Sequence, residues 1–130
     1  MKRDIKKMFV INAAVYPFDT VVAIGQIEAD IVKYIESELK YELDNEEKTY
    51  FVKFAGKGKT LQLKNGTGVL WVKRFNDGPF SHGVLSHEIF HVAYQILCSV
   101  GIKLTDSSEE AFSYLIQYLT QEILYNIYKK

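Results

Sequence analysis

The chain contains 130 residues, of which 48% are hydrophobic and 25% are charged. This composition is typical of one folded domain and excludes a disordered or fibrous polymer. Sixteen basic residues balance sixteen acidic ones, so the chain has no general attraction for nucleic acid or for an anionic membrane. The single cysteine, Cys98, cannot form an internal disulfide, and a reducing cytoplasm is therefore the expected environment.

Neither a signal peptide nor a membrane span is expected. Basic residues at the N-terminus are followed by an apolar run, but that run is short and contains Asn12. No stretch approaches the roughly 18 consecutive apolar residues that a membrane-spanning helix needs.

The first half of the chain predicts strands followed by a helix. Residues 7–15 are mostly apolar, as in a strand buried on both faces, and residues 21–24 continue in the same character. Residues 16–19, Tyr-Pro-Phe-Asp, predict a turn between them. Apolar positions that recur every four residues predict an amphipathic helix over residues 26–43. Residues 44–48 then predict a solvated loop with no ligand site.

Three strand-like segments follow, at residues 50–54, 61–64 and 69–75. Asn65-Gly66, between the second and the third, is the strongest short-range signal for a β-hairpin. Residues 56–60, Gly-Lys-Gly-Lys-Thr, resemble a phosphate-binding loop only superficially, because the spacing of a Walker loop is absent.

The last third predicts two helices, at residues 82–100 and 108–128, separated by a stop at Gly101. Residues 1–130 are therefore expected to form a single α+β domain. In this domain a small mixed or antiparallel sheet packs against an N-terminal helix and two C-terminal helices.

The first C-terminal helix contains the motif H-E-x-x-H, formed by His87, Glu88 and His91. Helix positions i and i+4 lie one above the other, so the two imidazoles can bind one tetrahedral zinc ion. Glu88 lies one residue further round the helix, where its carboxylate can accept a proton from a metal-bound water. Alternatively, both histidines are ordinary helix residues and Glu88 is solvated.

A catalytic zinc ion also needs a third protein ligand and an open fourth position. Glu110 lies nineteen residues after His91, which leaves room for the helix to end, turn at Gly101 and return. Glu110 is therefore the favoured third ligand and Glu109 the second choice, although either glutamate could instead cap its helix. Cys98 lies on roughly the metal face, where a buried thiol is more often part of a core.

At these residues the sequence resembles the zincin metallopeptidases, and more closely the gluzincin branch, in which a glutamate on a following helix completes H-E-x-x-H. Residues 86–92 and 109–115 are similar to small, minimal gluzincin-like proteins, many of which are encoded by phages or bacterial mobile elements. The match covers the last third of the chain.

The resemblance implies a zincin-like metallopeptidase domain whose zinc ligands are His87, His91 and Glu110, with Glu88 as the general base. It also implies a mixed sheet with an edge strand just before the first metal helix, at residues 69–75. An extended peptide could pair with that edge. The alternative is an internal strand.

One departure from larger gluzincins lies just after the third ligand, where those proteins carry an acidic residue that orients a ligand histidine. This chain has Ser113 and Tyr114 in that region, so another acceptor would have to orient the histidine. Candidate hydrogen-bond donors to the oxyanion formed during hydrolysis are His82, Tyr94, Tyr114 and Tyr118.

The sequence thus predicts zinc-dependent hydrolysis of a peptide or protein substrate, with Glu88 activating the attacking water. The alternative is a non-catalytic, zinc-stabilised binding or interaction module of a phage or bacterial protein. A third interpretation is a metal-free packing domain. No nucleic-acid or membrane partner is expected, and the expected location is the cytoplasm, that of the host if a phage encodes the chain.

Overall fold

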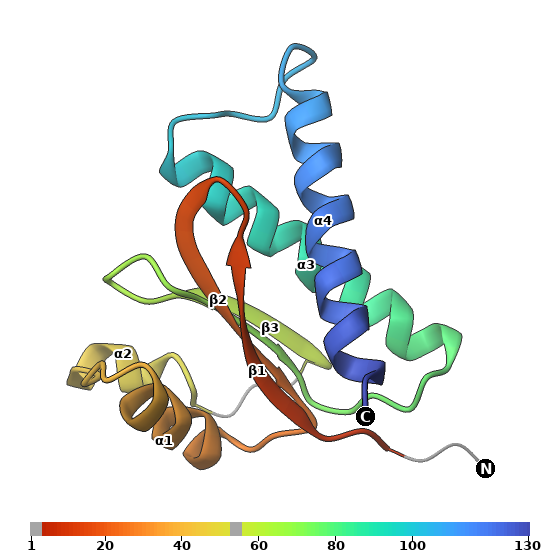
Figure 1. Cartoon of the computed structure of the whole chain (residues 1–130). Helices are drawn as coiled ribbons and strands as arrows, with labels where there is room; N and C mark the ends of the chain where they lie inside the picture. Colours follow the sequence, from red (N-terminus) through yellow and green to blue (C-terminus); the bar gives the residue numbers. More distant parts are fainter. Residues whose placement is uncertain (1–3, 53–55) are drawn as a thin grey trace.

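A computed structural model describes residues 4–52 and 56–130 of the chain (Figure 1). Over these two ranges the chain forms a four-stranded mixed sheet and four helices, which confirms the predicted α+β class. The strands are β1 (Lys7–Ala13), β2 (Tyr16–Ile24), β3 (Gly58–Gln62) and β4 (Gly68–Val72). The helices are α1 (Glu28–Glu38), α2 (Asn45–Thr49), α3 (Pro79–Ser99) and α4 (Glu109–Tyr128).

The sheet has the order β1-β2-β4-β3, in which β2 and β4 are parallel and the two outer pairs are antiparallel. Helices α3 and α4 pack on one face and α1 on the other (Figure 1). Val22 and Leu70 face the first of these two cores, whereas Val21 and Trp71 face the second. Residues 21–24 of β2 and 69–72 of β4 are buried on both faces of the sheet, and these segments are accordingly continuously apolar.

The turn expected at residues 16–19 is wrong, because those residues already belong to β2. The hairpin turns at Ala14 and Val15, and Ala14 adopts the left-handed conformation with φ of 59°. Pro17 fits in β2 because the β1–β2 register shifts there and β4 pairs with β2 only from Thr20 onwards. A proline without an N–H therefore removes no ladder hydrogen bond to β4.

The expectation that residues 69–75 form a sheet edge is also wrong. Strand β4 covers residues 68–72 and pairs with β2 on one side and β3 on the other. The alternative, an internal strand with Trp71 in the core, is confirmed: Trp71 is 3% exposed, and its Nε1 donates a 2.9 Å hydrogen bond to the carbonyl of Gln26. The strand with a free edge on the α3 side is β3, joined to β4 by the hairpin that Asn65-Gly66 predicts.

The segment expected to be a solvated loop forms α2 and contains a buried carboxylate, that of Glu47, which is 1% exposed. It accepts hydrogen bonds from the Tyr41 hydroxyl (2.7 Å) and from the backbone N–H groups of Lys64 (2.8 Å) and Asp44 (3.1 Å). Burial alone would raise the pKa of Glu47, but these hydrogen bonds outweigh it and lower the pKa below the usual value. Tyr50–Val52 follow as turn and bend residues instead of the expected strand, and the remaining residues of that strand lie outside the described ranges.

The other helices follow their sequence periodicity. Helix α1 is shorter than expected because Lys40 adopts a left-handed conformation with φ of 55°, although Leu43 beyond it is still buried. Helices α3 and α4 are confirmed, and Gly101 ends the first of them with φ of 86°. Within the described ranges, no helix combines the length and apolar character that crossing a membrane requires.

Candidate metal centre

His87 and His91 lie one turn apart on α3, and their Nε2 atoms are 3.2 Å apart. Two nitrogens that each lie about 2.0–2.1 Å from a tetrahedral zinc ion are about 3.3 Å from each other. The pair therefore has the spacing of two ligands on one metal ion. A hydrogen bond between two neutral imidazoles, one of them donating Nε2–H, gives the same distance without metal.

Glu88 is buried beside this pair, with 6% of its surface exposed, so the interpretation of Glu88 as a solvated residue is wrong. The hydroxyl of Thr60 on β3 donates a 2.7 Å hydrogen bond to Glu88 Oε1. The other oxygen, Oε2, lies 4.0 Å from His87 Nε2. The sheet thus holds one carboxylate oxygen while the second lies beside the imidazoles.

Strand β3 approaches α3 most closely at Gly58. A Cβ atom at this position would lie 2.9 Å from Glu88 Cγ, 3.1 Å from Glu88 Oε2 and 3.1 Å from Val84 Cγ1. These separations are shorter than ordinary van der Waals contacts, so only glycine lets the strand pass here without moving Glu88. Residues 56–60, with their superficial likeness to a phosphate-binding loop, thus lead into the strand that positions the carboxylate.

The structure does not bring the expected third ligand to the histidine pair. Glu110 and Glu109 are exposed in the first turn of α4, which begins after the loop that follows α3 (Figure 1). Within residues 4–52 and 56–130, no group of three His, Cys, Asp or Glu side chains is arranged to hold a metal ion. The capping alternative is not formed either, because the N-cap residue, Ser108, makes no side-chain capping hydrogen bond.

The donor set therefore fits zinc in part. Two imidazole nitrogens at ligand spacing and an adjacent buried carboxylate suit a zinc ion and its general base. The third ligand is supplied only if the first turn of α4 and the histidine pair approach each other. Glu110 in that role stays a prediction.

The other residues considered from the sequence are mostly remote from the pair. Cys98 is exposed and so is not the core thiol expected. His82 Nε2 instead lies 3.1 Å from Asp77 Oδ1 and 3.0 Å from the Tyr128 hydroxyl. Of the tyrosines considered as oxyanion donors, Tyr94 alone lines the hollow next to His91. Tyr114 and Tyr118 line a different hollow, against the β1–β2 turn.

The histidine pair opens into a hollow of about 360 Å³ between α3 and β3. Gln95, one turn beyond His91, also lines it, and the buried Oε1 of Gln95 has no hydrogen-bond partner within the described part of the chain. Sequence reasoning missed Thr60, Gly58 and Gln95. Only the i+4 spacing from His91 could have indicated Gln95, whereas nothing local indicates the other two.

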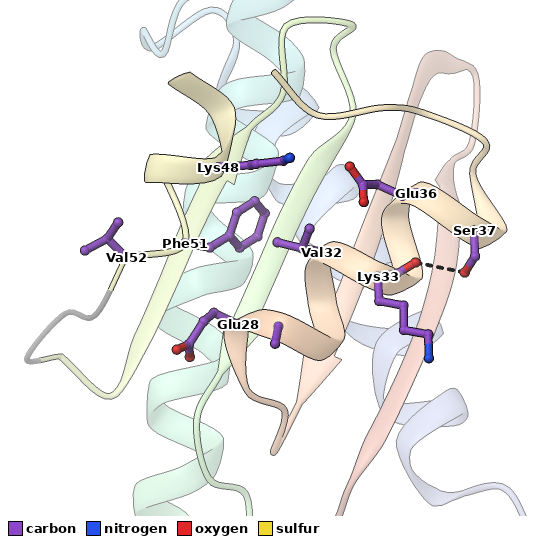
Figure 2. Close-up of a pocket in the computed structure, with 9 residues that line it drawn as sticks. Glu28, Val32, Lys33, Glu36, Ser37, Lys48, Phe51 and Val52 are labelled. Carbon is purple, nitrogen blue, oxygen red and sulfur yellow. Dashed lines mark hydrogen bonds between the residues drawn. The ribbon is translucent and has the colours of Figure 1, made fainter. Parts of the chain in front are cut away.

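A larger hollow, of about 880 Å³, lies on the opposite side of the sheet between α1 and the residues that follow α2 (Figure 2). Phe51 and Val32 line its apolar wall, while Lys48 and Glu36 extend at its rim. Charges of both signs surround it, and among the described residues that line it no group of His, Cys, Asp or Glu side chains is arranged to hold a metal ion. We therefore place the candidate chemistry at the histidine pair.

The chain matches no protein-family model, no curated protein and no solved structure. Its function must therefore be inferred from the geometry of the site itself.

Proposed function

We propose that this chain is a minimal zinc-dependent peptidase. One observation carries the proposal: two histidine Nε2 atoms 3.2 Å apart lie beside a carboxylate that is buried and anchored by Thr60. If the two histidines were ordinary surface residues, nothing would require a buried glutamate beside them. Burying a carboxylate costs free energy unless it is hydrogen-bonded. Two imidazoles with a carboxylate beside them are the groups that a catalytic zinc ion and its general base require.

The proposed chemistry divides between the ion and the protein. When bound, zinc would polarise the carbonyl of the scissile bond and lower the pKa of a water molecule. His87 and His91 would hold the ion, with Glu110 as the predicted third ligand. Glu88 would accept the proton of the attacking water and then deliver it to the leaving amine, and the hydrogen bond from Thr60 keeps its carboxylate oriented for both steps.

The substrate would be an extended peptide. Both sides of β4 are occupied within the sheet, so the peptide cannot pair with residues 69–75 as the sequence suggested. The outer edge of β3 has no strand beside it among the described residues and runs past Glu88 through Gly58 and Thr60. A peptide added there as a fifth strand would pass the histidine pair.

The first test is the metal content of the purified protein, measured by elemental analysis. We expect about one zinc ion per chain, lost in His87→Ala and in Glu110→Ala but retained in His82→Ala, a control that removes the histidine outside the pair. Chelation should lower the melting temperature of the wild-type protein, because an ion that binds only the native state stabilises it. Absence of zinc from the wild type, with none taken up on titration, would refute the proposal.

The second test separates catalysis from a structural metal. Glu88→Gln should retain zinc and lose about 10²- to 10⁴-fold in peptide cleavage, the usual contribution of a general base. A zinc-loaded wild type that cleaves no peptide in a diverse library would favour the non-catalytic zinc module instead. Full cleavage by Glu88→Gln would contradict the assigned role of this residue.

A further inference from the structure

The hollow at the histidine pair continues along the N-terminal half of α3. A second hollow of about 580 Å³ extends from His87 and Glu88 to Phe80, and a third of about 360 Å³ extends from Phe80 to Arg74. The second and third hollows share one wall, which is lined by Gly56, Lys57, Phe80 and Val84. Together they form one groove between α3 and the start of β3, which we call the N-terminal groove.

Basic residues line this groove, with Lys57 along both hollows and two further cations at the end away from the histidines. Lys57, Lys73 and Arg74 line the third hollow, and no acidic residue within the described ranges does. Among the described residues, Glu88 is the only acidic one that lines the second hollow, and it lies at the histidine end. Since the chain as a whole has a formal charge of zero, this charge is a local concentration rather than a general property of the surface.

Arg74 and Lys57 differ in how available their positive charges are to bind a ligand. Arg74 Nε forms a 3.0 Å ion pair with Asp4 Oδ2, which offsets part of its charge. Lys57 is exposed and makes no ion pair with any residue of the described ranges. The first turn of α3 contains no acidic residue, and the carboxylate nearest to the start of this helix, that of Asp77, lies 3.1 Å from His82 Nε2.

The length of the groove sets which substrate residue would meet this charge. Phe80 and His87 are seven residues apart on α3, or about 10 Å at 1.5 Å per residue. An extended peptide advances about 3.3 Å per residue, so about three peptide residues cover this distance. Phe80, which is 70% exposed, and Val84 offer an apolar wall for the methylene stem of a side chain that ends in a carboxylate.

We propose that the N-terminal groove selects peptides carrying Asp or Glu within three residues of the cleaved bond, and that Lys57 is the principal specificity residue. The proposal rests on the proposed peptidase function. The group that the groove binds is the carboxylate of a substrate side chain. The carboxylate at a peptide C-terminus has the same chemistry, so the experiment must distinguish the two.

The cleavage experiment uses peptides with acetylated and amidated ends that differ only in one residue, Glu, Gln or Lys, placed at each position within three residues of the cleaved bond. Zinc-loaded wild type should cleave the Glu peptides about fivefold faster than the Gln peptides at one of these positions, the effect of about one near-surface charge interaction. Lys57→Glu should remove or invert this preference, and added salt should weaken it. Lys103→Glu, the same charge reversal on an exposed lysine in the loop after α3, should retain it.

Equal cleavage of the Glu and Gln peptides, or a preference that Lys57→Glu leaves unchanged, would overturn the proposal. A preference confined to peptides with a free C-terminal carboxylate would overturn the assignment to a side chain.

A binding experiment distinguishes failure of this proposal from failure of the peptidase function. The same peptides, labelled with an uncharged fluorophore, are titrated by fluorescence anisotropy with the Glu88→Gln protein. Binding of the Glu peptide about fivefold more tightly than the Gln peptide, lost on adding Lys57→Glu, supports the anionic groove even if wild type cleaves nothing. Equal affinities, or no binding of either peptide, overturn it whatever the cleavage result.

Discussion

The close approach of β3 to Glu88 predicts that Gly58→Ala is destabilising. The added Cβ would lie 2.9 Å from Glu88 Cγ, so the glutamate or the strand must retreat by about 0.5 Å to reach an ordinary contact. Overpacking of this kind costs about 1–3 kcal/mol, of which the reduced entropy of the unfolded chain returns about 0.4–1 kcal/mol. The free energy of unfolding should therefore fall by about 1–2 kcal/mol, or about 4–8 °C in melting temperature.

The assay is urea unfolding of Gly58→Ala beside Gly83→Ala. Gly83 lies within α3, and a Cβ there would meet no atom within 4 Å. The control should consequently gain about 1 kcal/mol from the better helix propensity of alanine. Displacement of Glu88 by about 0.5 Å in Gly58→Ala should also lower peptide cleavage by about 10-fold, since misplacing a reacting group by about 1 Å costs about 100-fold. An unfolding free energy for Gly58→Ala equal to or above that of wild type would refute the reasoning about this contact.

Two further substitutions test polar contacts outside the site. Glu47→Gln should lower the unfolding free energy at pH 7 by about 1.5–3 kcal/mol, because an amide has a single acceptor oxygen: if that oxygen keeps the donors of Tyr41 and Lys64, its NH2 group faces the Asp44 N–H, which loses its acceptor. Hydrogen bonding lowers the pKa of Glu47 below 4.5, so the difference in unfolding free energy between wild type and variant should be present above pH 4.5 and shrink as the pH falls through the lowered pKa. A difference in unfolding free energy that persists at pH 2 would contradict this prediction. Tyr128→Phe should cost about 1 kcal/mol by removing the hydrogen bond to Asp77. Burial, together with this hydrogen bond, raises the pKa of Tyr128 to about 12. The stability lost in the variant should therefore decline above pH 10, where the tyrosine ionises first in the unfolded chain. Thermal melts at pH 7 and pH 10.5 that show equal losses of stability would count against this prediction.

Features that depend on neighbours in sequence could be predicted. The apolar stripe around His87 and His91 predicted a helix that places the two imidazoles together, and the structure confirms both. Asn65-Gly66 likewise predicted the turn between β3 and β4, since its conformational preference is local. Glu110 shows the limit of such reasoning, because nineteen residues of spacing permit a return toward His91 but do not fix the direction of α4.

Other features required the packed chain. Thr60 and Gly58 meet Glu88 across 28 and 30 residues of sequence, and no pattern within either segment encodes that contact. A buried Glu47 in an acidic, loop-like segment was missed for the same reason, because its hydrogen bond from the Lys64 N–H comes from 17 residues away.

The sequence by itself determined α3, α4, the hairpin between β3 and β4, and the pairing of His87 with His91, because each follows from the period or the turn chemistry of a short segment. The tertiary structure decided the strand order, and with it that β4 is internal and β3 carries the free edge next to Glu88. Strand order depends on which apolar faces the helices can cover at once, and that requirement involves the whole chain rather than any one segment.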